Sequence, residues 1–353
     1  NIENILNFEK DFPDTCVIKL EENYRSTQTI LKAAAGVVSE NRNRKEKTLW
    51  TQNEQGEPIV YYRAEDEADE ARSVCEFIVK HNQEEGVLFN DMAVLYRTNA
   101  QSRVMEEALR GSDIPYKLIG GFRFYERKEI KDVLAFVRVI FNPLDSVSLR
   151  RIINVPARGI GKTSIDKIEK FSDLKEVHLM EGLRQACVSK VVASGSTKKI
   201  LNFLKIMDDL STFYENSSLV DFLQEVVERT GYGDMLKNDA TRESKDRIDT
   251  LNELFTAIQQ SEERGETLQD FLDTTALVSD SDSIDDSRGV LQVMTLHTCK
   301  GLEYDSVYIL GLEDGLLPHA SSMSDPEEYE EERRLCYVGI TRAKKKLCIS
   351  NAR

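Results

Sequence analysis

The sequence lacks the features of membrane, metal-binding and disulfide-stabilised proteins. No apolar run in its 353 residues approaches the roughly 20 residues that a transmembrane helix needs. The six cysteines are scattered without a C-x-x-C pair, and the four histidines show no metal-ligand spacing. We therefore expect no metal site, no disulfide framework and no membrane association, and a reducing cytoplasm fits this composition.

The first residues also lack a targeting signal. Asn1 to Asn4 contain neither an initiator methionine nor the basic and apolar segment of a secretory signal. The chain is therefore expected to be a fragment of a longer protein. Its hydrophobic fraction of 40% and charged fraction of 31% are typical of a soluble globular protein. The length predicts about two domains, each with its own core.

The net charge of −15 by itself argues against a nucleic-acid binder, because neutralising phosphates requires clustered lysine and arginine. The charge is uneven, however. Acidic residues concentrate at 65–70, 280–286 and 325–332, and basic residues concentrate at 42–47 and 344–346. Local basic patches could bind DNA despite the negative total. The net charge is therefore weak evidence for or against nucleic-acid binding.

The two ends of the chain alternate between strand and helix patterns. Short apolar segments predict strands at 16–20, 59–62, 92–96, 117–119, 290–296, 306–310 and 347–350. Helices are predicted at 27–39, with Ser26 as its N-cap, at 66–82 and at 99–110. This alternation predicts an α/β fold with a parallel sheet covered by helices on both faces.

The middle of the chain has a different pattern. From 123 to 280, apolar residues recur at helical spacing almost throughout, with the first helix ended by Asn142-Pro143. The polar segment 279–289 then returns the chain to the sheet. We expect an α/β domain formed by 1–122 and 281–353, interrupted by an inserted all-helical domain at 123–280.

Two stretches near the C-terminus carry the clearest functional signal. In 293–303 (VMTLHTCKGLE), an apolar strand leads into a polar loop, where open α/β sheets commonly bind ligands. In 330–343 (EEERRLCYVGITRA), a charged helix leads to Arg342, whose fork of donors suits phosphate oxygens. An ordinary turn at Lys300-Gly301 and a surface role for Arg342 are the alternatives.

Together these stretches resemble motifs V and VI of the UvrD/PcrA/Rep-like superfamily 1 DNA helicases. Residues 20–26 (LEENYRS) resemble motif IV of the same family. The order and spacing also fit, with a long helical insertion between motifs IV and V, so the resemblance spans essentially the whole chain. It implies a C-terminal fragment of such a helicase, namely the second RecA-like domain with its helical insertion.

The resemblance implies one wall of an ATP site. Tyr24 would stack on the adenine, while Arg25 and Arg342 would act as arginine fingers at the γ-phosphate. Glu303 would contact the sugar of the nucleotide or its surroundings. The cofactor would be ATP with Mg²⁺, whose ligands are expected in the missing N-terminal half. A half-buried aromatic, surface salt bridges and simple solvent exposure are the respective alternatives.

The resemblance also implies a track for single-stranded DNA. Thr295 and His297 would contact the DNA backbone. Arg97 and Asn99, which belong to a further family stretch at 96–103 (YRTNAQSR), would contact single-stranded DNA. A partly buried histidine is the alternative for His297. Three aromatic residues could stack on bases, with core packing as the competing explanation for at least one of them: Phe122, Phe124 and Tyr125.

Two further stretches resemble nucleotide-binding motifs but have simpler explanations. Gly161-Lys162-Thr163 ends like a phosphate-binding P-loop, but Pro156 stands where the first glycine should be. We interpret Gly159 to Gly161 as a tight turn between helices, with Ser164 capping the next helix. The family has a similar turn that contacts duplex DNA, which makes Gly159, Gly161 and Ser164 candidate DNA contacts, and a plain helix–helix turn is the alternative.

The second motif is the acidic run at 66–69 (DEAD), which spells the Walker B signature of another helicase superfamily. Acidic residues in the first turn of a helix are favoured by its dipole, and this explains the run without a metal. The chain therefore contains neither a P-loop nor a credible Walker B carboxylate. An NTPase needs both to hold the phosphates and Mg²⁺.

The sequence thus predicts part of an ATP-dependent 3′–5′ DNA helicase or translocase that is inactive as an ATPase alone. Its expected partners are single-stranded DNA, junctions of single and double strands, the missing RecA-like domain, and proteins of repair or replication. A cytoplasmic, nucleoid-associated location follows from the resemblance. The alternative is a non-catalytic helicase-like subunit of a repair or recombination complex, and a stand-alone NTPase is disfavoured by Pro156.

Overall fold

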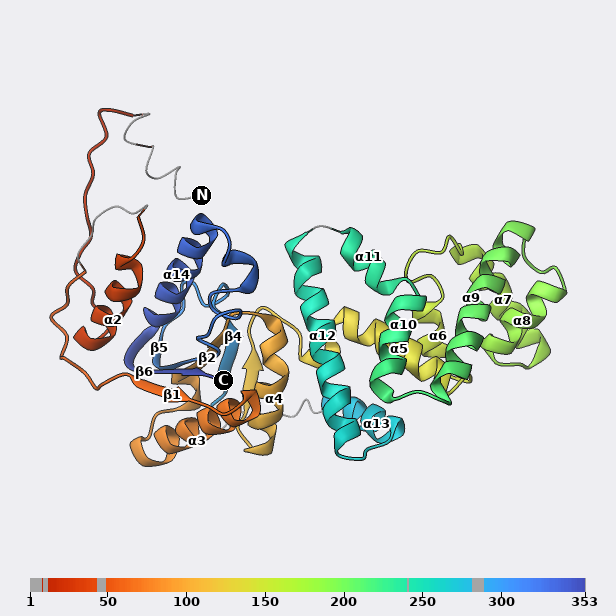
Figure 1. Ribbon diagram of the computed structural model, residues 1–353, viewed down its shortest axis with the longest axis horizontal. Coiled ribbons are helices and arrows are strands. Elements are labelled where there is room, and N and C mark those ends of the chain that lie inside the picture. Colours follow the sequence, from red (N-terminus) through yellow and green to blue (C-terminus); the bar gives the residue numbers. More distant parts are fainter. Residues whose placement is uncertain (1–7, 9–11, 43–48, 240, 281–288, 353) are drawn as a thin grey trace. The chain divides into compact units, whose positions relative to one another are not determined.

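The computed structural model describes residues 8, 12–42, 49–239, 241–280 and 289–352 (Figure 1). The chain divides into two compact units. The first, an α/β unit, comprises Asn1–Phe122 with Ser283–Arg353, and the second, a helical unit, comprises Arg123–Asp282. Within the described residues, no helix combines the length and the apolar character needed to cross a membrane.

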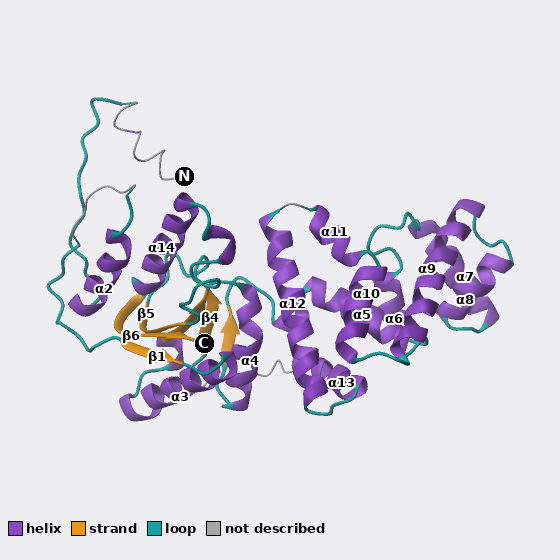
Figure 2. Ribbon diagram, viewed as in Figure 1, coloured by secondary structure: helices purple, strands orange, loops and turns teal. Residues whose placement is uncertain are grey.

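The α/β unit is built on a sheet of six strands, all of them parallel (Figure 2). The strands are β1 (Val60–Arg63), β2 (Met92–Tyr96), β3 (Tyr116–Leu118), β4 (Leu291–Thr295), β5 (Tyr304–Ile309) and β6 (Ala343–Asn351). Their order in the sheet is β1-β6-β5-β2-β4-β3. Strand β2 from the N-terminal segment therefore lies between β4 and β5 from the C-terminal segment, which makes the two segments one fold.

Helices cover both faces of this sheet, as the alternating sequence pattern predicted. They are α2 (Gln28–Ser39), α3 (Glu67–Glu85), α4 (Ser102–Gly111) and α14 (Pro326–Ile340). Strand β2 shows how the faces are separated, because successive side chains point to opposite sides. Val94 packs in the core with α3 and α4, and Leu95 packs in the core with α2 and α14. The fold is therefore an α/β parallel sheet with helices on both sides.

The second unit is entirely helical among its described residues. Its helices are α5 (Lys128–Phe141), α6 (Ser146–Ile152), α7 (Lys162–Lys175), α8 (Leu179–Val188), α9 (Ser194–Tyr214), α10 (Leu219–Arg229), α11 (Tyr232–Asn238), α12 (Arg242–Glu263) and α13 (Leu268–Asp280). Helix α5 contributes ten buried residues and ends at the Asn142-Pro143 pair, as predicted. It forms the centre of this unit's core, with α9, α10 and α12 packed against it.

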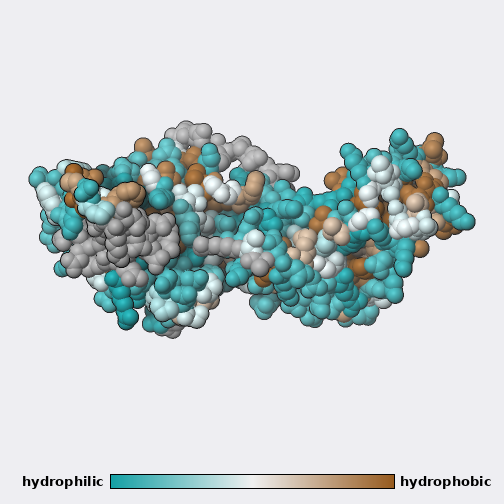
Figure 3. Space-filling model, turned by 90° about the horizontal axis from the view of Figure 1, so that it is seen from above, coloured by the Kyte–Doolittle hydropathy of each residue, from teal (hydrophilic) through white to brown (hydrophobic). Residues whose placement is uncertain are grey.

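The surface is mixed in polarity. On the face that Figure 3 shows, hydrophilic residues predominate and apolar residues form separate patches. Among the exposed apolar residues of the helical unit are Leu174 and Val188, with 84% and 85% of their surface accessible. Scattered apolar residues of this kind are usual on protein surfaces.

Three local predictions are wrong. The segment 16–20 is extended but forms no strand, and Ile18 and Leu20 are each 78% exposed. An extended segment becomes a strand only where a neighbouring segment accepts its backbone hydrogen bonds. In the described chain, the first such pairing after this segment is the isolated bridge between Glu22 and Trp50. Ser26 does not cap α2, because its hydroxyl donates to the carbonyl of Ala343 instead.

The third concerns the turn before α7. Gly161, not Ser164, stands at the N-cap, and Ser164 lies in the first turn of the helix. The side chain of Ser164 pairs with Ser196 on α9. The acidic run, by contrast, lies where predicted, since Asp66 is the N-cap of α3 and its carboxylate accepts from the backbone N–H of Asp69.

Candidate functional site

The loop that carries Arg25 is fixed from both sides. The side-chain oxygen of Asn23 accepts hydrogen bonds from the backbone N–H groups of Arg25 and Ser26, each at 2.9 Å. Ser26 is buried, and its hydroxyl binds the Ala343 carbonyl at 2.6 Å. The turn is therefore attached to the start of β6, which fixes the point from which the Arg25 side chain extends.

Arg25 meets a carboxylate and the end of a helix. Its Nε donates to Glu303 Oε2 at 2.7 Å, and its Nη1 donates to the carbonyl of Thr341 at 3.1 Å. Lys344 approaches the other oxygen of Glu303 at 3.2 Å. The hydrogen bonds from Arg25 and Lys344 hold the pKa of Glu303 below its usual range. One carboxylate thus joins two cationic side chains that are far apart in the sequence.

Arg342 lies beside this group and forms no ion pair with a carboxylate in the described part of the chain. Its guanidinium donates to the carbonyls of Val338 and Leu302, at 2.9 and 3.1 Å, and to the hydroxyl of Thr341 at 3.1 Å. Its pKa is lowered by burial and, next, by the charge of Arg25. The protein therefore orients two guanidinium groups close together and leaves positive charge available for an anion.

The position of this cluster differs from the sequence interpretation. Glu303 immediately precedes β5 and Arg342 immediately precedes β6, so the cluster lies at the amino ends of two strands. The interpretation of the motif V loop was based on the carboxyl ends of strands, and this is wrong for Glu303. The loop starts at the carboxyl end of β4 and crosses to the other end of the sheet, turning at Gly301 with φ of +90°.

Tyr24 is close in sequence and strongly exposed. Its side chain is 79% accessible, and its hydroxyl donates to Glu22 at 2.7 Å. This hydrogen bond is the main cause of the raised pKa of Tyr24. The half-buried aromatic considered as an alternative is therefore not what the structure contains. A free ring face is what stacking on a base requires, and that role stays a prediction.

Most of the candidate DNA contacts lie at the opposite end of the sheet. Thr295 ends β4 and pairs in register with Tyr96, the last residue of β2, so the segments that follow these strands are neighbours. The hydroxyls of Thr295 and Thr298 are 2.9 Å apart, and His297 is exposed rather than partly buried. Asn99 begins a short 3-10 helix just after β2 and is partly accessible.

Arg97 is placed differently from the other DNA candidates. Its side chain is 7% accessible and forms a bidentate pair with Glu332 on α14, with Nη2 to Oε1 at 2.6 Å and Nε to Oε2 at 2.9 Å. A guanidinium used in this way has a structural role. The aromatic candidates also separate: Phe122 is 69% exposed, whereas Phe124 and Tyr125 are buried in the core of the helical unit and do not present a face for stacking.

The glycine turn of the helical unit is rigidly held. Gly159 has φ of +66°, and the side-chain oxygen of Asn154 accepts from the backbone N–H groups of Arg158 and Ile160, at 2.9 and 3.2 Å. Lys199 donates to the Gly159 carbonyl at 3.0 Å. The turn is thus a preformed structure beside a lysine, and no strand leads into Gly161 as a P-loop would require.

Comparison with known proteins identifies the family of the chain. Residues 18–353 match the model of the UvrD-like helicase C-terminal domain. The chain belongs to this family. It is 44% identical over 361 aligned residues to the ATP-dependent DNA helicase PcrA of Staphylococcus aureus strain NCTC 8325 / PS 47, and equally so to PcrA of Staphylococcus epidermidis strain ATCC 12228 / FDA PCI 1200. All of the chain is aligned, and it spans 49% of the length of each of these relatives.

The cluster in this UvrD-like domain has the chemistry for a phosphate group and not for a metal. Arg25, Arg342 and Lys344 supply N–H donors and positive charge, and Glu303 is the one acidic side chain paired with them in the described residues. Throughout the described chain, no three histidine, cysteine, aspartate or glutamate side chains gather as a metal site. The phosphates of ATP therefore fit the residues present, whereas Mg²⁺ finds no ligand set among them.

Two supporting residues of the UvrD-like domain escaped sequence reasoning. Arg158 is partly buried. It donates to the carbonyl of Val155 in the turn after α6 at 2.6 Å and to that of Thr230 at the end of α10 at 3.0 Å, and burial lowers its pKa to about 10. Glu332 is one member of the acidic concentration at 325–332. The partner of Glu332 lies 235 residues away, so no local pattern indicates it. For Arg158, the bond to Thr230 spans 72 residues, whereas Val155 is only three residues away.

Proposed function

We propose that this UvrD-like domain forms one wall of the ATP cleft, and part of the single-stranded DNA track, of an ATP-dependent 3′–5′ DNA helicase or translocase. The observation that carries the proposal is the convergence of Arg25, Arg342 and Lys344 around the single carboxylate of Glu303. The relatives that cover the whole chain are named as ATP-dependent DNA helicases, which supports the same assignment.

In this proposal the two arginines act at the nucleotide. ATP, when bound, supplies the γ-phosphoryl group whose transfer to water drives movement. Arg25 and Arg342 donate hydrogen bonds toward that group and stabilise the negative charge that develops on its oxygens. Thr341, which binds both guanidiniums, keeps them aligned. Glu303 neutralises Arg25 and accepts from the sugar hydroxyls, while the exposed ring of Tyr24 stacks on the adenine.

The DNA track in this proposal lies at the other end of the same sheet. Thr295, His297 and Asn99 contact the sugar–phosphate backbone, and the exposed ring of Phe122 stacks on a base. In the helical unit, the turn at Gly159 and Gly161, with Ser164 in the helix that follows, contacts duplex DNA through backbone N–H groups. Arg97 supports this track from within, because its buried pair with Glu332 fixes α14.

The proposal also assigns what the chain does not supply. It contains no P-loop lysine and no strand-end carboxylate for Mg²⁺, so it is proposed to hydrolyse no ATP by itself. Its main partner is then a P-loop-bearing RecA-like domain that provides both. DNA junctions, repair or replication proteins, and a cytoplasmic, nucleoid-associated location belong to the same proposal.

Reconstitution tests this function. The chain is mixed with a separately produced P-loop-bearing RecA-like domain from one of the PcrA relatives, and ATP hydrolysis is measured with and without single-stranded DNA. We expect DNA-stimulated hydrolysis in the mixture and none in either part. Arg342→Ala should reduce it by about 10³-fold, the scale of an arginine finger. Lys345→Ala is the matched control, because Lys345 is 67% exposed and pairs only with Asp305 in the described chain.

A mixture that assembles on a sizing column but hydrolyses no ATP would contradict the proposal. It would favour a non-catalytic helicase-like subunit that binds DNA within a repair or recombination complex. The same result would follow if Arg342→Ala had no more effect than Lys345→Ala.

A further inference from the structure

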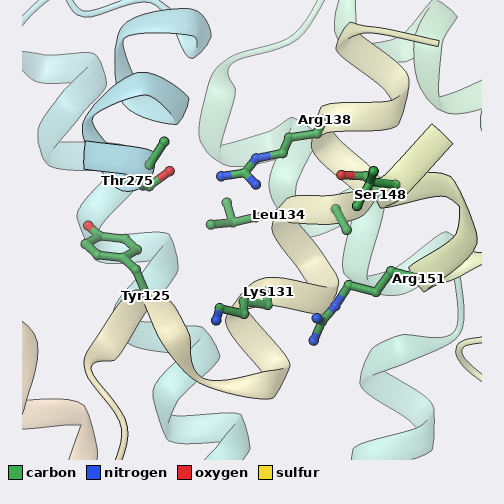
Figure 4. Close-up of a pocket in the computed structure, with 10 residues that line it drawn as sticks. Tyr125, Lys131, Leu134, Arg138, Ser148, Arg151 and Thr275 are labelled. Atoms are coloured by element: carbon green, nitrogen blue, oxygen red, sulfur yellow. The ribbon is translucent and has the colours of Figure 1, made fainter. Parts of the chain in front are cut away.

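The helical unit contains a hollow lined by cationic side chains that the proposed function does not use (Figure 4). Its volume is about 360 Å³, and it lies against α5, α6 and α13. Lys131, Leu134 and Arg138 occupy positions i, i+3 and i+7 of α5 and therefore share one face of that helix. Figure 4 shows the Lys131 and Arg138 side chains extending from this face toward the side on which Tyr125 and Thr275 lie.

The positive charge in this hollow is only partly neutralised. Arg151 also lines it, and its Nε donates to Asp132 at 2.7 Å, which holds the guanidinium in place. Neither Lys131 nor Arg138 forms an ion pair among the described side chains, although Arg138 interacts electrostatically with Asp145. Cationic side chains gathered in one concave site can attract an anion even in a chain whose net charge is −15.

The rest of the lining is apolar or hydroxylic. Leu134 and Ala135 are each 3% exposed and form part of the hollow's lining together with Ala276. A volume near 360 Å³ lies within the range of about 300–1,000 Å³ that is usual for small-molecule sites. We propose that this hollow binds a small phosphorylated molecule of nucleotide size, with its phosphate between Lys131, Arg138 and Arg151.

An adjoining hollow favours a small molecule over a DNA backbone. This second hollow, of about 420 Å³, shares Arg138 and Ala276 with the first and is lined by Asp145 and Asp273. A DNA strand carries a phosphate at every nucleotide, so a strand that continued past Arg138 would bring its next charges against these carboxylates. A ligand with a single phosphorylated end meets only the cationic part.

Methyl NMR of the full chain tests the inference at the site itself. The methyl groups of Leu134 and Val147, both of which line the hollow, serve as reporters. Adenosine 5′-monophosphate, inorganic pyrophosphate and a short oligothymidylate are titrated separately. The same titrations on Arg342→Ala exclude effects relayed from the proposed ATP-cleft wall.

We expect saturable shifts of both reporters with the monophosphate. Lys131→Gln combined with Arg138→Gln should weaken this binding at least about tenfold, the equivalent of ~1.4 kcal/mol. Arg138→Lys keeps the charge and should retain most of the affinity. Arg150→Gln is the matched control on the same helix as Arg151, because Arg150 pairs with Glu169 and is not part of the lining.

Three results would overturn the inference. The first is the absence of saturable reporter shifts at millimolar monophosphate and pyrophosphate. The second is an equal loss of affinity in Arg150→Gln and in the double variant. The third is saturation by the oligothymidylate alone, which would assign the hollow to DNA. None of these results bears on the reconstituted ATP hydrolysis, so the two proposals fail independently.

Discussion

Arg97 and Glu332 form a buried bidentate ion pair that joins the carboxyl end of β2 to helix α14. The same carboxylate accepts from the backbone N–H of His319 at 3.1 Å. From Glu332, α14 continues to Ile340, a rise of about 12 Å at 1.5 Å per residue, and Arg342 follows its end. This one helix therefore connects the end of the sheet where most DNA candidates lie with the end where the arginine cluster lies.

Removing the carboxylate of this pair should destabilise the α/β unit. Glu332→Leu leaves the buried guanidinium of Arg97 without its partner, so we expect a loss of about 3–5 kcal/mol in the free energy of unfolding. Urea denaturation of the whole chain measures it. Adding Arg97→Met should restore much of the loss, because two apolar side chains leave no unpaired charge. Glu331→Leu, 71% exposed, is the control and should change stability by less than about 0.5 kcal/mol.

Acid should weaken the same pair. Burial by itself would raise the pKa of Glu332, but the hydrogen bond and charge of Arg97 outweigh it and lower the pKa overall. A carboxyl with a depressed pKa in the folded state stabilises the fold above its unfolded pKa, near 4.3, and loses this contribution as the pH falls through the folded value. Between about pH 6 and pH 3, the free energy of unfolding should therefore fall less steeply in Glu332→Gln than in the unsubstituted protein. An identical slope in both proteins would contradict this assignment.

Glu303 should limit how strongly the arginine cluster binds an anion. Glu303→Gln removes the charge that neutralises Arg25 and Lys344, so inorganic pyrophosphate should bind about two- to fivefold more tightly at low salt, or ~0.5–1 kcal/mol. Calorimetry measures the change, and the gain should disappear in Arg25→Ala. Asp305→Asn is the control, since Asp305 pairs with Lys345. Weaker binding of pyrophosphate to Glu303→Gln would show that the carboxylate does not compete with the anion.

The two glycines of the helical unit's turn should respond differently to alanine. Gly159 has φ of +66°, and a Cβ there would lie 2.5 Å from Lys199 Nζ, so Gly159→Ala should cost about 1–2 kcal/mol of stability and weaken duplex binding. Gly161 has φ of −70°, and the nearest atom to its Cβ would be 3.9 Å away. Gly161→Ala should therefore cost only about 0.5 kcal/mol, as expected at an N-cap. Thermal unfolding and anisotropy with duplex DNA distinguish the two, and equal effects would refute the explanation.

The sequence by itself determined the fold class and the family. Strand 92–96 was predicted with the bounds that the structure has, because a continuous apolar run between polar segments is typical of a buried parallel strand. Helix α5 and its end at Asn142-Pro143 followed from helical spacing and the restraint that proline places on the preceding residue. The motif stretches alone indicate that Arg25, Glu303 and Arg342 belong to one site.

Tertiary structure decided what those residues touch. Segment 16–20 has the composition of a strand but lies exposed, since a strand exists only where another backbone accepts its hydrogen bonds. Arg97 was expected at the DNA and instead pairs with Glu332, a partner 235 residues away that no local pattern indicates. Phe124 and Tyr125 became core residues for the same reason.

The hollow lined by Lys131, Arg138 and Arg151 likewise depends partly on local sequence and partly on tertiary structure. Their spacing on α5 and α6 was readable from the sequence, but the concave site exists only because α13 packs beside them. Local propensity and periodicity are properties of neighbouring residues, and they set which elements form. Burial, ion pairing and cavity shape depend on contacts between segments far apart in the chain, and only the folded structure supplies those contacts.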